Sequence, residues 1–190
     1  MPDRNFAPFI IIFLIVLSPV LWFIVTYNYL VRLKNFCRES WSGIDTELKR
    51  RYDLIPNLVE TVRGYARHER ETLERVVEAR NRAIASTGSP ASQAKDENVL
   101  VGSLKSLFAV VENYPVLKAS ENFLKLQEEL ANTEDRIQAA RRFYNANVRD
   151  LNTRIEVIPS NIIASIFGFK KDEYFEIESA IERAAPKVSL

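Results

Sequence analysis

The chain has a single histidine, His68, and this limits the metal and acid–base chemistry that its side chains can perform. A di-iron site in a helical bundle needs Glu-x-x-His pairs, and no glutamate stands three residues before His68. A zinc site of the HExxH kind fails as well, because Thr72 stands where the second histidine would be. Histidine-based metal motifs are therefore excluded, and only carboxylates are left as metal ligands.

A nucleophile paired with a base is the next chemistry to consider. The only cysteine, Cys37, stands 31 residues before His68, which is about 45 Å if both lie on one continuous helix. That distance rules out a catalytic pair, although a serine paired with His68 stays open. A single cysteine also excludes an internal disulfide. The sequence has no phosphate-binding loop of the GxxxxGKS or GxGxxG kind.

Cys37 falls in phase with the apolar residues around it, so we expect a buried small apolar side chain and not a reactive thiol. No other cluster of residues identifies a reaction. We therefore expect no cofactor, no metal and no enzymatic activity.

The stretch RRYDLIPN, at residues 50–57, places charges and a proline inside an otherwise regular apolar pattern. One interpretation is an internal ion pair between Asp53 and its neighbouring arginines. The other is a recognition surface, since exposed charge pairs on a helix contribute little to stability. The candidate interaction surface consists of Arg50, Arg51, Asp53 and Asn57.

These residues must be positioned by a helix that follows an apolar segment. Phe6 to Val25 reads FAPFIIIFLIVLSPVLWFIV, which is about the 20 apolar residues needed to cross a bilayer. A cleaved signal peptide is the alternative, but its apolar region is usually only about 7–15 residues long, and no A-x-A-like site follows here. We predict a short tail and a transmembrane anchor at residues 1–29.

Apolar or small residues continue after the anchor in steps of three and four from Leu30 to Tyr65, which predicts one amphipathic helix. The pattern keeps its phase through Pro56. We therefore predict that this proline kinks the helix and does not end it, and a new helix starting at Pro56 is the alternative.

Three further long helices are predicted at about 69–86, 90–113 and 120–158. Ser89 and Pro90 fit a helix cap followed by a first-turn proline, and Pro115 is expected to end the helix before it. Two long and two short helices joined by brief turns are typical of an up-down-up-down four-helix bundle. A long coiled-coil dimer is the alternative, but it would leave the short helices without apolar partners. We predict an all-α fold with one bundle domain at 30–177 and a tail at 178–190.

The stretch PSNIIASIFGFKK, at residues 159–171, predicts a short helix at 161–167 near the membrane. It could rest at the headgroups with its lysines toward lipid phosphate. The interpretation that we favour is a cap at the base of the bundle, with its apolar side chains covered. The tail from Asp172 is expected to begin as a polar helix. The candidate membrane-proximal residues are Ile162, Ile163, Ile166, Phe167, Phe169, Lys170 and Lys171.

Charges are frequent but balanced, with 26 lysines and arginines against 25 aspartates and glutamates. No basic run marks a surface for nucleic acid, so no nucleic-acid partner is expected.

The basic residues around the apolar segment predict its orientation. Arg4 precedes the segment, whereas Arg32, Lys34 and Arg38 follow it closely. The positive-inside rule then places the soluble domain in the cytoplasm.

Three stretches carry a family resemblance: YNYLVRLKN at residues 27–35, ESWSGIDTELKRRYDLIPNLVETVRGYARHE at 39–69, and RFYNANVRDLNTRIEVIPSNIIASIFGFKKDEYFEI at 142–177. The chain resembles the LemA family of bacterial membrane proteins over nearly its whole length from the anchor onward. The resemblance implies a four-helix soluble domain behind one N-terminal transmembrane helix, with most of the chain inside the cell.

The resemblance implies no mechanism, because the family is a set of envelope-associated proteins without an assigned activity or agreed catalytic residues. Some relatives are implicated in bacterial membrane organelles. Further conspicuous polar residues in the quoted stretches stay candidates without a role: Arg142, Asn145, Asn147 and Asn152.

The expected function is that of an interaction or scaffold protein at the bacterial inner membrane. Its expected partners are lipid around the anchor and other membrane proteins or further copies of itself. A membrane-shaping or lipid-interacting module is the alternative, and a carboxylate-based hydrolase is a weaker one.

Overall fold

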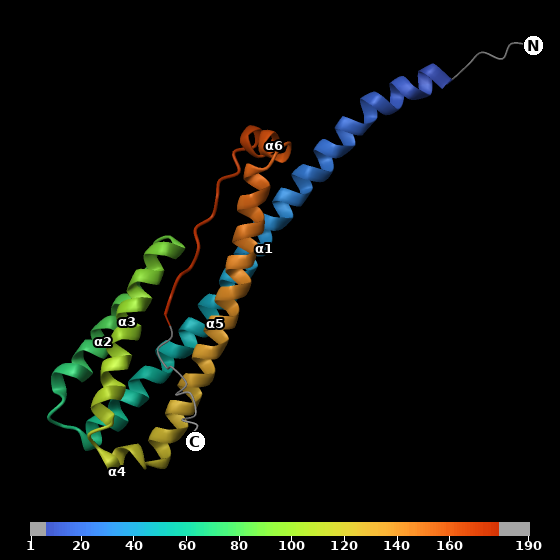
Figure 1. Cartoon of the computed structure of the whole chain (residues 1–190). Coiled ribbons are helices and arrows are strands. Elements are labelled where there is room, and N and C mark those ends of the chain that lie inside the picture. Colours follow the sequence, from blue (N-terminus) through green and yellow to red (C-terminus); the bar gives the residue numbers. More distant parts are fainter. Residues whose placement is uncertain (1–6, 179–190) are drawn as a thin grey trace, which may run out of the picture. The chain divides into compact units, whose positions relative to one another are not determined.

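The computed structural model describes residues 7–178, with side chains from Phe13 onward. This part of the chain contains six helices and no β-strand, which confirms the all-α prediction. The first helix is long (Figure 1), and its N-terminal part is apolar. Arg4 and the predicted tails at 1–6 and 179–190 lie outside the described residues.

The helices are α1 (Ala7–Tyr65), α2 (Arg70–Ala85), α3 (Pro90–Val111), α4 (Pro115–Lys118), α5 (Glu121–Glu156) and α6 (Ser160–Ile166). The short helix α4 was not expected. Pro115 does not simply end α3, which stops at Val111, but is itself the first residue of α4. A proline is tolerated there because the first N–H groups of a helix have no intrahelical partner.

Helix α1 is continuous through Pro56, as the phase of its apolar residues predicted. A proline at position 56 removes the N–H that would bond the carbonyl of Tyr52, four residues earlier. Arg80 of α2 supplies a donor instead, since its Nε lies 2.6 Å from the Tyr52 carbonyl oxygen. A side chain from a neighbouring helix thus satisfies the acceptor that the proline leaves open.

Contacts divide the chain into two units, which we describe separately. Among the described residues, the anchor unit comprises residues 7–39 and 146–172, and the core unit comprises residues 40–145 and 173–178. Helices α1 and α5 each contribute residues to both units.

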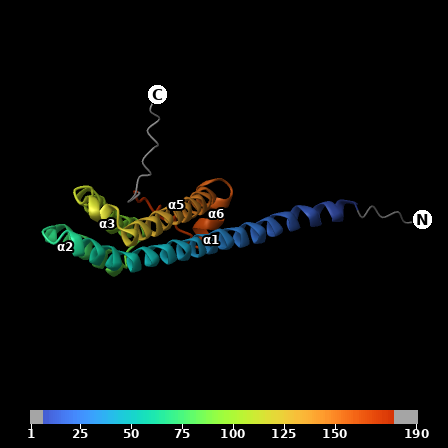
Figure 2. The same cartoon turned by 90° about the horizontal axis from the view of Figure 1, so that it is seen from below.

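In the core unit, apolar side chains from five helices, α1 to α5, are buried. Helices α2 and α3 pack against each other (Figure 2). Ser89 caps α3 through its Oγ, which accepts a hydrogen bond from the Ser92 N–H at 3.4 Å, and Pro90 follows as predicted. The up-down-up-down order of the helices stays a prediction. Fully buried residues include Ile44, Leu48, Ile55, Val76, Leu100, Leu104, Phe123 and Ile137.

The polar helix expected from Asp172 is wrong, because residues 169–178 form no helix. The segment is extended in Figure 1. Phe175 and Ile177 are buried, whereas Tyr174 and Glu176 are exposed. This alternation has the period of two that is typical of a β-strand. We call residues 173–178, which belong to the core unit, the strap.

Candidate functional site

The most buried charges of the core unit form a cluster around Arg51 of α1. Its Nη1 donates to Oε1 of Glu134 on α5 at 2.8 Å, and its Nη2 donates to Glu97 on α3. The Tyr52 hydroxyl also donates to Glu97. The side chains of Arg51 and Glu97 have no exposed surface, and that of Glu134 is 2% exposed. The cluster therefore ties α1, α3 and α5 together.

Burial changes the proton affinity of this cluster. Burial raises the pKa of Glu97, and the nearby Arg51 opposes that rise. Burial disfavours the charge on Arg51, but Glu134 and Glu97 outweigh it, so the pKa of the guanidinium is raised and the charge is kept. Burial, followed by the charge of Glu97, also raises the pKa of Tyr52. At neutral pH the tyrosine is therefore a hydrogen-bond donor.

The placement of Arg51 on an interaction surface was wrong, since this residue is completely buried. Its partners are glutamates on two other helices, and not Asp53. Arg50, Asp53 and Asn57 are exposed, and their role in binding stays a prediction. The sequence did contain a signal for this cluster. Glu97 stands three residues before the buried Leu100, and Glu134 three residues before the buried Ile137, so each glutamate lies on the buried face of its helix.

The arrangement of charges is structural. Among residues 13–178, no group of three or more histidine, cysteine, aspartate or glutamate side chains is placed to hold a metal ion. The Arg51 cluster pairs opposite charges across three helices, and two of its atoms, Nε of Arg51 and Oε2 of Glu134, have no hydrogen-bond partner among the described residues. Such a cluster can fix the relative register of the helices that it joins.

Cys37 lies in the anchor unit and is 2% exposed, which confirms the prediction that it is buried. Burial, and next the charge of Asp172, raises the pKa of its thiol to about 11. A thiol with this pKa is protonated at neutral pH, so it is a poor nucleophile.

The predicted membrane-proximal residues lie on and after α6, in the anchor unit. Ile163 is buried at 1%, and Phe169 is half-buried. The other three apolar side chains are exposed: Ile162 by 57%, Ile166 by 66% and Phe167 by 46%. The interpretation in which all the apolar side chains of this element are covered by the bundle is therefore wrong. Lys170 and Lys171 are also exposed.

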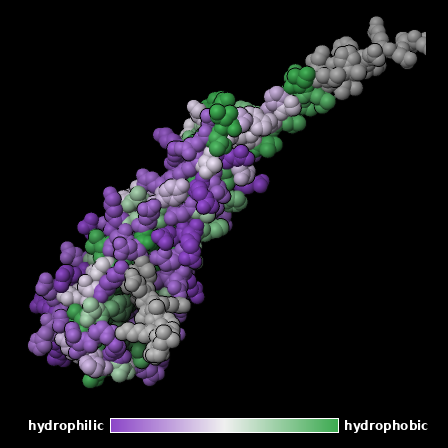
Figure 3. Space-filling model, in the orientation of Figure 1, coloured by the Kyte–Doolittle hydropathy of each residue, from purple (hydrophilic) through white to green (hydrophobic). Residues whose placement is uncertain are grey.

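Helix α6 lies beside the end of the apolar part of α1. The ring of Phe167 lies 4.6 Å from the ring of Tyr27 and 5.7 Å from that of Phe23, between centroids. Gly168 ends the element with φ +69°, and the Phe169 N–H bonds the Ala164 carbonyl at 2.9 Å. This left-handed glycine is typical of a helix C-terminus. Figure 3 shows hydrophobic residues gathered over α6 and the apolar part of α1.

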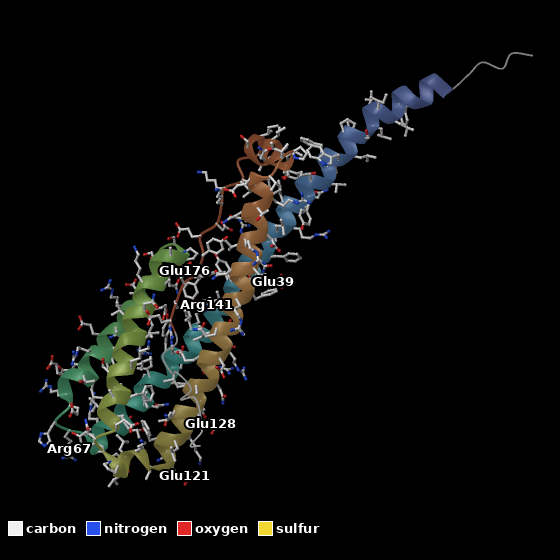
Figure 4. The ribbon with its side chains drawn as sticks, viewed as in Figure 1. Glu39, Arg67, Glu121, Glu128, Arg141 and Glu176 are labelled. Atoms are coloured by element: carbon white, nitrogen blue, oxygen red, sulfur yellow. The ribbon has the colours of Figure 1, made fainter. Side chains whose placement is uncertain are left out.

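The strap is held by side-chain amides. Asn145 of α5 bonds both the N–H and the carbonyl of Phe175, and Asn98 of α3 bonds the Glu176 carbonyl and the Glu178 N–H. Figure 4 labels Arg141 on α5, whose Nη1 donates to the Ile177 carbonyl at 3.0 Å, and Glu176 on the strap.

The anchor unit has its own pair of this kind. Asn152 of α5 donates to the Asp172 carbonyl at 2.9 Å and accepts from the Asp172 N–H at 2.9 Å. Asn145 and Asn152 were conspicuous in the sequence but had no assigned role, and Asn98 was missed. Asn145 and Asn152 are seven residues apart and therefore lie on one face of α5. This spacing was the sequence signal that could have indicated their shared role. Arg142 is exposed, and Asn147 donates to the Phe36 carbonyl at 3.5 Å.

Comparison with known proteins gives a family and several relatives. The model of the LemA family matches residues 40–190. Magnetosome protein MamQ 2 of Paramagnetospirillum magneticum is 27% identical over 182 residues, which cover 83% of this chain and 67% of that protein. Magnetosome protein MamQ of Magnetospirillum gryphiswaldense is 25% identical with the same coverage. Protein LemA of Metamycoplasma hominis is 28% identical over 180 residues, which cover 92% of this chain and 80% of that protein.

Proposed function

This chain belongs to the LemA family, and we propose that it is a membrane-anchored interaction or scaffold protein of the bacterial envelope, without enzymatic activity. It holds a helical domain at the membrane and presents the surfaces of that domain to other membrane proteins or to further copies of itself. The alternative of a carboxylate-based hydrolase has no positive support in the geometry of the described residues.

The observation that carries the proposal is the continuity of α1. In the described part of the chain, α1 is the one helix that is long and apolar enough to cross a membrane, by length and composition. Most of its large apolar side chains from Phe13 to Val25 are 37–65% exposed and Leu17 is half-buried, whereas Leu30 is fully buried and begins the covered face. Because no loop interrupts the helix between these parts, a lipid anchor and a folded domain share one element.

We further propose that the anchor spans the inner membrane with the domain in the cytoplasm, following the basic residues after the apolar segment. Arg32 and Arg38 are exposed, and Lys34 pairs with Asp172 at 2.5 Å. Protease added to intact spheroplasts should leave the domain uncut. Digestion there, with cytoplasmic marker proteins intact, would overturn the orientation.

The candidate interaction surface, reduced to Arg50, Asp53 and Asn57, is tested by charge reversal. Arg50 is exposed and has only a 3.8 Å contact with Glu47, so Arg50→Glu should leave the fold intact. We expect in-cell crosslinks from the face of α1 that carries Arg50 to fall at least several-fold. Arg136→Glu, a change at an exposed position of α5, is the matched control. If Arg50→Glu is folded and keeps every crosslink, this face is not the interaction surface.

A lipid-interacting module is the second candidate, and the exposure of Ile162, Ile166 and Phe167 favours it. These apolar side chains lie next to Tyr27, at the end of the apolar segment, where amphipathic rings prefer the bilayer interface. An element of this composition can rest at the headgroups with its lysines toward phosphate.

A nitroxide label at Ile166→Cys tests this second candidate in full-length protein reconstituted into lipid nanodiscs. We expect the label to be accessible to oxygen and shielded from a water-soluble nickel complex. A label at Asp150→Cys, an exposed position of the same unit, should show the opposite pattern. Equal nickel accessibility at both positions would rule out contact of α6 with lipid.

A further inference from the structure

We propose that the groove between α3 and α5 of the core unit is a binding site for an extended peptide, and that the strap of a second copy of this chain occupies it in place of the chain's own strap. The inference rests on the proposed function, because it names the surface and the partner through which an interaction protein of this kind acts.

The groove recognises the backbone of its occupant. Asn145 donates from Nδ2 to the Phe175 carbonyl at 3.0 Å, and its Oδ1 accepts from the Phe175 N–H at 2.9 Å. Asn98 donates to the Glu176 carbonyl at 3.2 Å, and its Oδ1 accepts from the Glu178 N–H at 2.9 Å. A carboxamide group thereby takes the place of a peptide group in a neighbouring strand, as in recognition of peptides by strand addition.

The two walls of the groove hold opposite edges of the strap. In an extended chain the N–H and C=O groups of successive residues point to opposite sides. Helix α5 bonds Phe175 and Ile177, and α3 bonds Glu176 between them. At Glu178, where the strap ends, Asn98 of α3 bonds the N–H and Gln138 of α5 bonds the carbonyl. The strap is therefore bonded on both sides, as a central strand is in a sheet.

The spacing of the amides on α5 matches the repeat of an extended peptide. Gln138 of α5 donates to the Glu178 carbonyl of the strap at 3.4 Å. Asn145 stands seven residues after Gln138 on α5, and it bonds Phe175, which stands three residues before Glu178 on the strap. Seven residues of helix advance about 10.5 Å, and three residues of strand advance about 10 Å. A helix with amides seven residues apart can thus follow a peptide that runs antiparallel to it.

The side-chain pockets set the specificity of the groove. Phe175 is fully buried, with its ring centroid 5.2 Å from that of Trp41 at an interplanar angle of 89°, and Ile177 is 4% exposed. The Trp41 ring also lies 5.3 Å from the Tyr144 ring, and the Tyr144 hydroxyl donates to the Glu173 carbonyl at 3.0 Å. An aromatic residue followed two positions later by an aliphatic residue is the pattern that the groove accepts.

The charge of the groove complements an acidic peptide. Lys105 of α3 pairs with Glu178 at 3.0 Å, and Arg141 of α5 bonds the backbone beside it. The strap carries glutamates at 173, 176 and 178. The ligand class is therefore an acidic, extended segment with an aromatic and an aliphatic residue two positions apart.

The strap of a second copy fits this description in every contact, because its sequence is the same. Exchange of identical segments between copies conserves the contacts and changes only the path of the connecting chain. A membrane anchor confines the copies to one plane, which raises their effective concentration toward that of the tethered strap. For these reasons we commit to a second copy as the occupant.

The test uses cysteines at the Lys105–Glu178 contact in the full-length protein. Both side chains are substantially exposed, at 41% and 71%, so Lys105→Cys and Glu178→Cys should not disturb the fold. Two differently tagged copies, each with one of these changes, are co-expressed, and isolated membranes are treated with a flexible bismaleimide crosslinker, whose spacer replaces the reach of the lysine and glutamate side chains that a direct disulfide would lack. We expect a covalent heterodimer that carries both tags. A single chain with both changes should form an internal crosslink at the same time.

Two further variants separate a specific exchange from random collision. Asn98→Ala with Asn145→Ala in the Lys105→Cys copy should lower the yield of heterodimer at least fivefold. Phe175→Ser with Ile177→Ser in the Glu178→Cys copy should lower it to the same extent. Heterodimer that is insensitive to both sets of changes, or absent while the two-cysteine chain crosslinks internally, would overturn the exchange. A two-cysteine chain that fails to crosslink would overturn the groove itself.

The outcome is separable from that of the proposed function. If copies do not exchange straps but in-cell crosslinks still join this protein to other membrane proteins, the inference falls and the interaction function stands. If neither kind of crosslink forms, both fall.

Discussion

At the scale of single residues, the Arg51 cluster is the feature on which the core unit depends most. One guanidinium compensates two glutamates, and none of the three side chains is more than 2% exposed. Removing one partner of a buried ion pair is costly, because the charges that remain are neither solvated nor paired. Arg50, its neighbour in the sequence, is exposed and serves as a matched comparison.

We expect Arg51→Ala to destabilise the protein by about 3–5 kcal/mol, as is typical for breaking a buried pair. Arg50→Ala should change the stability by no more than about 0.5 kcal/mol, as is usual at the surface. Thermal unfolding followed by circular dichroism, in one detergent for all variants, measures both. Equal stability of the two variants would contradict a structural role for the cluster.

The pH dependence of this effect follows from Glu97. Burial raises its pKa in the folded protein above the unfolded value, so the folded state binds the proton more readily. The stability that it contributes is therefore present below the unfolded pKa, about 4.3, and is lost as the pH rises through the folded pKa. Loss of Arg51 should raise the folded pKa further. The stability gap between Arg51→Ala and the unmodified protein should narrow as the pH falls.

Cys37 should be inert in the folded protein. The pKa of its thiol in the folded protein, about 11, lies above the ordinary value of 9.0, so the folded state holds this proton more tightly than the unfolded state does. The resulting contribution to the free energy of unfolding is fully present below pH 9 and is lost as the pH rises toward 11. We expect alkylation by iodoacetamide at pH 8 to be at least 100-fold slower in the folded protein than in guanidinium. Mass spectrometry of timed samples measures the modified fraction. Similar rates in both states would show that the thiol is accessible.

At the scale of elements, the continuity of α1 through Pro56 depends on a donor from another helix. Arg80 of α2 bonds the Tyr52 carbonyl, for which the proline offers no N–H. We expect Arg80→Ala to cost about 1–3 kcal/mol, the usual penalty for leaving an acceptor unsatisfied. Amide hydrogen exchange near Pro56 should accelerate in the variant.

Arg75→Ala is the control for that change, because Arg75 is also on α2 but is 60% exposed and contacts residues of its own helix, Glu71 at 4.0 Å and the Thr72 hydroxyl at 3.4 Å. It should leave exchange near Pro56 as it is in the unmodified protein. If both variants exchange alike, the bond from Arg80 does not support the helix at the proline.

The elements differ in how far the sequence predicts them. The long helices and the Ser89 cap follow from local apolar periodicity and turn chemistry, and the structure has them. The strap was read as a polar helix, because nothing local shows that Asn98 and Asn145 replace a partner strand. An internal ion pair was one interpretation of the stretch around Arg51, but its partners, Glu97 and Glu134 on other helices, were not predicted. Both features depend on residues far apart in the sequence, and only the packed helices bring them together.

At the scale of the whole molecule, one helix forms both the apolar segment and part of the folded domain, and we propose that the partners are proteins in the same membrane. Membership of the LemA family agrees with this description without assigning a reaction. The proposed interaction surface on α1 and the proposed binding groove of the core unit are two distinct places at which we expect partners to bind.

In-cell crosslinking of the full-length protein, followed by mass spectrometry, tests this central claim most directly. The anchor must be intact so that membrane neighbours are present. We expect crosslinks from the core unit to a second membrane protein or to further copies of this chain, and the crosslinked residues identify the face in use. Efficient crosslinks within the chain with none to any other membrane protein or copy would contradict it.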